Sequence, residues 1–151
     1  GVDSALDLKG KLGGDRSTAL AAVRQLMSGL TSLDLSQNNV DAEAAKAIAE
    51  TLKPGGVLGI VQHRGGSDLS LEQMKNTAYV SEEKVIELAE LAGLELDSRS
   101  EINANPRDTK DHPRGVWTLP PSLAEGDKDR DRYLAIGESD RMTLRFVKAA
   151  D

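Results

Sequence analysis

The residue best placed to do chemistry is His63, because an imidazole titrates near neutral pH and can move protons. It follows an apolar run over residues 57–61, at the point where a buried strand would end. There it could act as a general base that takes a proton from an acceptor hydroxyl or amine. It could also be a polar strand end that bonds to a neighbouring loop, and the sequence leaves both interpretations open.

The second histidine, His112, lies in the segment DTKDHP beside two carboxylates, Asp108 and Asp111. Imidazole nitrogens and carboxylate oxygens are metal ligands, so a metal site is one interpretation of this segment. Because the chain contains only two histidines and no cysteine, we favour a solvated turn and predict no metal site.

Length and charge narrow the classes of function. The 151 residues suit one domain with a hydrophobic core of its own. The 25 acidic residues outnumber the 19 basic ones, and the net charge of −6 argues against a nucleic-acid-binding surface. No apolar segment approaches the roughly 20 residues that a membrane span needs, and no signal peptide is recognisable. We expect a small-molecule substrate, no nucleic-acid or membrane partner, and a cytoplasmic location by default.

Hydrophobic periodicity predicts strands and helices that alternate along most of the chain. Strands are expected at residues 5–8, 30–35, 57–61, 94–102 and 142–148, and helices at residues 15–29, 41–52 and 81–92. Ser81 is the candidate N-cap of the last helix. Residues 103–126, which hold four of the five prolines, predict a loop. Residues 133–136 and 142–148 are expected to pair as an antiparallel hairpin.

The stretch LKPGGVLGIVQHR, residues 52–64, organises this pattern. Pro54 should stop the preceding helix, and Gly55 and Gly56 should turn the chain into the apolar strand. Apolar residues on both strand faces indicate that both faces are covered, which favours a central strand of a parallel sheet. The predicted fold class is α/β: an open, mostly parallel sheet with helices on both faces and an antiparallel last strand. His63 and Arg64 follow at the carboxyl end of the strand, where such sheets bind ligands.

The same stretch, together with INANPRDTKDHPRGVWTLPPSL and YLAIGESDRMTLRFVK, resembles a bacterial group of predicted methyltransferases within the class I S-adenosylmethionine-dependent methyltransferases. This resemblance covers residues 42–148. It implies a Rossmann-like sheet with a final antiparallel strand inserted into it, S-adenosylmethionine as cofactor, and methyl transfer to an unknown small acceptor. Residues 1–151 would then form a single methyltransferase-like α/β domain, in which residues 41–151 match strongly and residues 1–40 weakly.

The first third of the chain resembles the cofactor-binding half of that family. ALDLKGKLGGD is similar to the first motif, where a strand ending in Asp-Leu runs into a glycine-rich turn that approaches the cofactor. The resemblance implies cofactor contacts for Asp7, Gly10, Gly13 and Gly14. SLDLSQNN is similar to the second strand of the family, and it implies that Asp34 accepts hydrogen bonds from the ribose hydroxyls.

Two departures from the family pattern concern this same half. Lys9 and Lys11 stand where the family has glycines, and lysine is unfavourable beside a cationic ligand by both size and charge. The family also has two further strands and a helix between its second strand and the proline-glycine turn, whereas this chain has only the helix at residues 41–52 there. We therefore expect cofactor binding that is weak or absent, and a shortened or inactive relative is the alternative to an active enzyme.

Another resemblance leads to a different function. The segment LTSLDLSQNNVDAEAAKAIAETL, residues 30–52, is similar to a leucine-rich repeat in which Asn38 would bond the backbone of the turn. Solenoids need about three or more repeats to bury a core. The alternative function is therefore a non-catalytic leucine-rich-repeat-like or structural interaction module. A parallel sheet that contains Leu6, Leu33 and Val57 favours the methyltransferase, whereas a curved stack of strands favours the solenoid.

Overall fold

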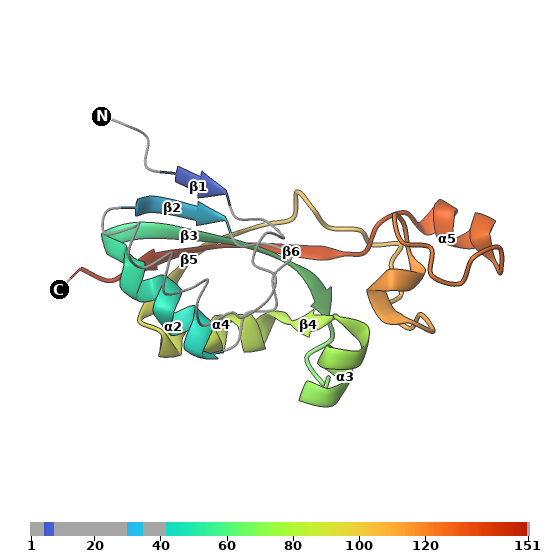
Figure 1. The fold of residues 1–151 in the computed structure, drawn as a ribbon, viewed down its shortest axis with the longest axis horizontal. Coiled ribbons are helices and arrows are strands. Elements are labelled where there is room, and N and C mark those ends of the chain that lie inside the picture. The colour runs from blue at the N-terminus through green and yellow to red at the C-terminus, as the bar shows by residue number, and fades with distance from the viewer. Residues whose placement is uncertain (1–4, 8–29, 35–41, 151) are drawn as a thin grey trace. The chain divides into compact units, whose positions relative to one another are not determined.

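The computed structural model describes residues 5–7, 30–34 and 42–150 (Figure 1). The elements are β1 (Ala5–Asp7), β2 (Leu30–Asp34), α2 (Ala42–Thr51), β3 (Leu52–Gly65), α3 (Leu71–Thr77), β4 (Val80–Ser81), α4 (Glu82–Leu91), β5 (Leu94–Ser100), the 3-10 helix η1 (Gly115–Thr118), α5 (Arg130–Ile136) and β6 (Arg141–Lys148). They fall into two compact units. The first comprises Gly1–Val61, Ile86–Arg99 and Leu144–Asp151, and the second comprises Gln62–Val85 and Ser100–Thr143.

The first unit is built on a mostly parallel sheet with the strand order β1-β2-β3-β6-β5. β1, β2 and β3 are parallel, and Leu6, Leu33 and Leu58 are register partners across them. The last strand, β6, is antiparallel and lies between β3 and β5. These pairings confirm the predicted α/β fold class and the insertion of the final strand. The helix predicted at residues 15–29 lies outside the described residues.

The start of β3 differs from the prediction. α2 ends at Thr51, and the strand begins at once with Leu52 instead of after a turn at Pro54 and Gly55. Leu30 of β2 faces Leu52, but Ser32 faces Val57, so β3 has extra residues in a bulge. Proline lacks a ladder donor and Gly55 has a φ of +74°, so these residues fit a bulge as well as a turn.

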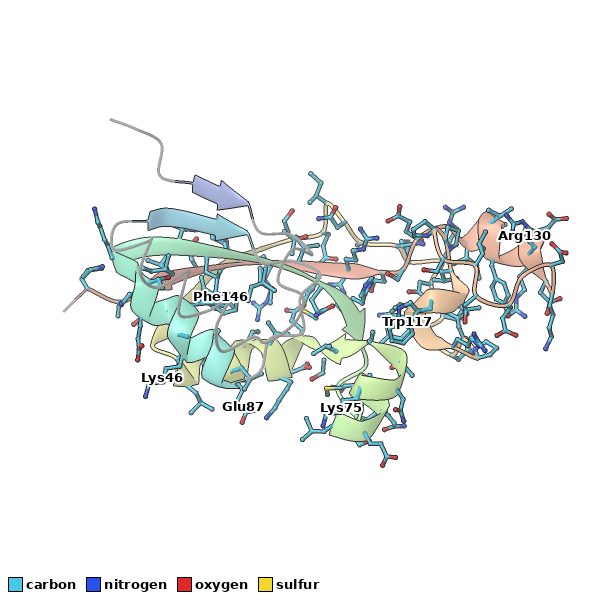
Figure 2. All side chains as sticks on the ribbon, viewed as in Figure 1. Lys46, Lys75, Glu87, Trp117, Arg130 and Phe146 are labelled. Carbon is cyan, nitrogen blue, oxygen red and sulfur yellow. The ribbon has the colours of Figure 1, made fainter. Side chains whose placement is uncertain are left out.

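The core of the first unit is aliphatic apart from Phe146, which lies on β6 (Figure 2). Its buried side chains include Ala45, Ile48, Ala49, Leu52, Leu58, Leu94, Leu144 and Phe146. α2 lies along the sheet (Figure 1), and its buried positions follow the helical spacing that the sequence predicts. The prediction that residues 57–61 are buried on both faces is wrong, because only Leu58 is buried in this run. An apolar run indicates which residues can be buried, but it does not show what covers each face.

The second unit includes the end of β3, from Gln62 to Gly65. The end of β3 pairs in parallel with the short strand β4, with Arg64 opposite Val80 and Gly65 opposite Ser81. A Cβ at Gly65 would overlap Leu69 Cδ1 and lie 3.1 Å from Tyr79 Cβ, so glycine suits this close approach. The Ser81 side chain accepts the N–H of Lys84, which confirms the predicted cap of α4.

Near the end of the second unit, the structure has a helix where the sequence predicted a strand. Residues 130–136 form the helix α5 with Tyr133 buried, and Gly137 caps it in a conformation with positive φ. They are therefore not the first strand of a hairpin. The four largely apolar residues 133–136 are too few to distinguish a strand from a helical turn.

The packing of Leu58 generates a test of the first unit. Leu58 is 4% exposed in the middle of β3, so Leu58→Ala should lower the free energy of unfolding by about 3 kcal/mol through lost burial and a residual cavity. Leu91→Ala is the control, because Leu91 is 74% exposed and should cost well under 1 kcal/mol. Urea denaturation of both variants measures the difference, and equal losses would contradict this assignment of the core.

Candidate functional site

The carboxyl ends of β1 and β2 place two predicted cofactor residues next to each other. Asp7 and Asp34 are the last residues of their strands and are register partners, and Asp34 is in turn the partner of Gly59 on β3. Open α/β sheets bind ligands outside the carboxyl ends of their parallel strands. Gly10, Gly13 and Gly14, which would follow Asp7 in the cofactor turn, lie outside the described residues.

The position of β2 in the sheet was not predicted from the sequence. β2 lies between β1 and β3. In the common doubly wound order, the second strand lies on the far side of the first strand from the fourth and fifth. Residues 30–34 resemble a second strand in sequence, yet they occupy the place of a fourth strand. In such sheets dinucleotides bind in the crevice between the first and fourth strands, where the strand order reverses. In this protein β1 and β2 occupy those two places.

His63, the candidate base, belongs to the second unit and contacts a serine. Its Nδ1 lies 2.5 Å from the Oγ of Ser139, which is only 5% exposed. Burial lowers the pKa of His63 below its usual value, and the nearby Arg141 lowers it further, while Asp108 and Glu138 oppose the shift. A lowered pKa keeps the imidazole neutral near pH 7, which is the state that a general base needs.

A buried carboxylate, Asp108, lies at the centre of the second unit. It accepts hydrogen bonds from the Tyr79 hydroxyl at 2.9 Å and from the backbone N–H groups of Lys110 and Asp140. Its Oδ1 also lies 2.8 Å from the Nε2 of His112. Burial, together with the bond to Asp108, raises the pKa of Tyr79 well above its ordinary value. Four partners from three segments of the chain thus converge on one carboxylate.

This arrangement corrects the interpretation of the segment DTKDHP as a solvated turn. Asp108 and His112 are each only 6% exposed, whereas Asp111 is exposed as predicted. Within the part of the chain that the structure describes, no three histidine or acidic side chains are arranged to hold a metal ion. No local pattern indicated this network, because Tyr79 and Asp140 lie 29 and 32 residues from Asp108.

A second carboxylate, Asp140, ties the loop to the end of β3. It accepts hydrogen bonds from Arg64 Nε at 3.0 Å, from Lys110 Nζ at 2.9 Å and from the backbone N–H of Asn105 at 2.9 Å. Burial alone would raise the pKa of Asp140, but these donors outweigh it and hold the pKa well below its usual range. Arg64 also forms a bidentate pair with Glu101. The segment around Ser139 is thereby fixed to the strand that carries His63.

Removing this charge tests the network. Asp140→Asn should lower the free energy of unfolding by about 2 kcal/mol at pH 7, between the values for exposed and buried ion pairs. The folded state depresses the pKa of Asp140, so its contribution is present above the unfolded pKa of about 3.9 and is lost as the pH falls below it. The difference between wild type and variant should therefore shrink in acid.

The control is Asp127→Asn, which removes an exposed carboxylate from the same unit. It should change the free energy of unfolding by less than about 0.5 kcal/mol at either pH. Guanidinium denaturation at pH 7 and pH 3 measures both variants. A difference for Asp140→Asn that stays constant with pH would contradict its role as an ionised anchor.

One comparison with known proteins is informative about the fold. No known protein-family profile matches the chain, and no curated protein matches it in sequence. Among solved structures, the cyclase SpnF aligns with a TM-score of 0.53 and 18% identity over 83% of this chain and 53% of its own. A putative sarcosine dimethylglycine methyltransferase from Galdieria sulphuraria aligns with a TM-score of 0.53 and 13% identity over 83% of this chain and 55% of its own.

The fold is the Rossmann-like methyltransferase fold. The chain spans about half the length of these two solved structures. One of them is described as a cyclase and the other as a methyltransferase, so the shared fold does not by itself determine the reaction. In the described part of the chain, no helix has the length and apolar character to cross a membrane.

Proposed function

We propose that this protein binds S-adenosylmethionine and transfers its methyl group to a small acceptor. The observation that carries the proposal is the sheet, which matches a putative methyltransferase and places Asp7 and Asp34 together at the carboxyl ends of β1 and β2. Two carboxylates suit a ligand that has a positive sulfonium, an ammonium group and ribose hydroxyls. The net charge of −6 supports a small-molecule acceptor over a nucleic acid.

Each candidate residue has a proposed role. Asp34 accepts hydrogen bonds from the ribose hydroxyls of the cofactor. Asp7 lies beside it, and the turn with Gly10, Gly13 and Gly14 lets the backbone approach the methionine part. The cofactor supplies an electrophilic methyl group. A nitrogen or oxygen of the acceptor would receive that methyl group, and His63 would take the proton that the acceptor loses.

The competing function is a non-catalytic structural or interaction module. None of the described strands occupies the places of the second and third strands in the doubly wound order. The absence of these two strands from the described sheet favours a protein that keeps the sheet without the activity. The solenoid version of this alternative has less support, because an antiparallel β6 between β3 and β5 does not continue a stack of parallel repeats.

Calorimetric titration with S-adenosylmethionine separates the two functions. The proposal predicts saturable binding at a single site, weak because Lys9 and Lys11 replace glycines in the cofactor turn. S-adenosylhomocysteine should compete for the same site, because it differs only by the transferred methyl group. The absence of saturable heat with either compound would overturn the proposal and favour the non-catalytic module.

The proposed role of the Asp34 carboxylate gives the most specific test of this proposal. Asp34→Ala should weaken S-adenosylmethionine binding by roughly 1.5 to 3 kcal/mol, the range for hydrogen bonds to a charged group. Glu95→Ala is the matched control, because Glu95 is an exposed carboxylate on β5, at the opposite end of the strand order from β1. Equal affinities for wild type and Asp34→Ala would contradict the role of Asp34, provided that circular dichroism shows the variant to be folded.

A further inference from the structure

Ser139 has a contact that the proposed function does not use. Its Oγ lies 2.5 Å from Nδ1 of His63, although the two residues are 76 positions apart in the sequence. Ser139 belongs to the short turn between α5 and β6. A hydroxyl so close to one ring nitrogen restricts the rotation of the imidazole, and it accepts from that nitrogen in one tautomer and donates to it in the other.

The backbone on both sides of Ser139 is held in place. The carbonyl of Glu138 accepts a hydrogen bond from Asn105 Nδ2 at 2.6 Å. The N–H of Asp140 donates to the buried Asp108 carboxylate at 2.8 Å, and the Asp140 carbonyl accepts the N–H of Arg64 at 2.9 Å. The serine hydroxyl is therefore preorganised against the imidazole, since its flanking residues cannot move without breaking these bonds.

We propose that Ser139 is a positioning residue for His63: its Oγ accepts a hydrogen bond from Nδ1–H, and this leaves the electron pair of Nε2 free to take a proton from the acceptor. This inference rests on the proposed function in so far as His63 acts as a base. When the acceptor's proton moves to Nε2, the ring becomes an imidazolium with a proton on each nitrogen. The Nδ1–H bond to Ser139 is kept throughout, so no further group has to move.

Nuclear magnetic resonance of the full chain labelled with 15N-histidine tests this directly, because the 15N shifts report which ring nitrogen carries the proton. The chain has only two histidines, and His63→Gln assigns the two sets of signals. His112 is an internal reference, since its Nε2 lies 2.8 Å from Asp108 and must carry the proton there. We expect opposite tautomers: Nδ1–H for His63 and Nε2–H for His112.

Three serine variants then connect the tautomer to the hydroxyl. Ser139→Ala should move the His63 15N shifts away from the Nδ1–H form and leave those of His112 unchanged. Ser139→Thr restores a hydroxyl and should restore the Nδ1–H form. Ser122→Ala, which changes an exposed serine of the same unit, should alter neither histidine.

The outcomes separate this inference from the proposed function. An Nε2–H form of His63 in the wild-type chain overturns the inference whether or not any variant folds. An unchanged His63 tautomer in Ser139→Ala also overturns it, even if S-adenosylmethionine binds. Covalent labelling of Ser139 by a fluorophosphonate would overturn it too, because the serine would then be a nucleophile that His63 activates. A serine-dependent Nδ1–H form without cofactor binding would support the positioning while the methyltransferase proposal fails.

Discussion

The second unit depends on the burial of one carboxylate. A charge such as that of Asp108 is stable away from water only when hydrogen-bond donors replace its hydration, and this requirement fixes the positions of the donors. Tyr79, His112 and the backbone of Lys110 and Asp140 all supply such donors. The segment between β5 and α5, residues 101–129, has little regular structure apart from η1 and thereby obtains one defined path. The contact between Ser139 and His63 follows from that path.

The first unit depends on a different constraint, the register of three parallel strands. Because strand residues alternate between faces, a slip of one residue would exchange the buried and exposed sets of side chains. The register that pairs Leu33 with Leu58 also pairs Asp34 with Gly59 and Asp7 with Asp34. The hydrophobic pattern thus brings the last residues of β1 and β2 to the same edge of the sheet. The extra residues of β3 lie in the bulge near its start, so they do not change which residues are partners at this edge.

Local signals predicted much of the fold. The apolar runs located the strands, Ser81 marked the start of α4, and Gly93, whose φ is positive, marks its end. The sequence did not reveal which strand lies beside which, because adjacency depends on contacts between distant segments. Residues 30–34 therefore matched a second strand in sequence and occupy the place of a fourth. The Asp108 network also depends on contacts between distant segments. In addition, the segment around His112 has no helical or strand period that would indicate burial.

The most direct measurement of the central claim is the location of the cofactor on the chain. Ultraviolet irradiation of the protein with S-adenosylmethionine labelled in its methyl group, followed by mass spectrometry of the peptides, maps the residues next to the ligand. Our account predicts label on peptides that contain the carboxyl ends of β1 and β2, around Asp7 and Asp34. This label should disappear in the presence of excess S-adenosylhomocysteine. Label confined to peptides from β5 or α5, or label that S-adenosylhomocysteine does not displace, would contradict the account.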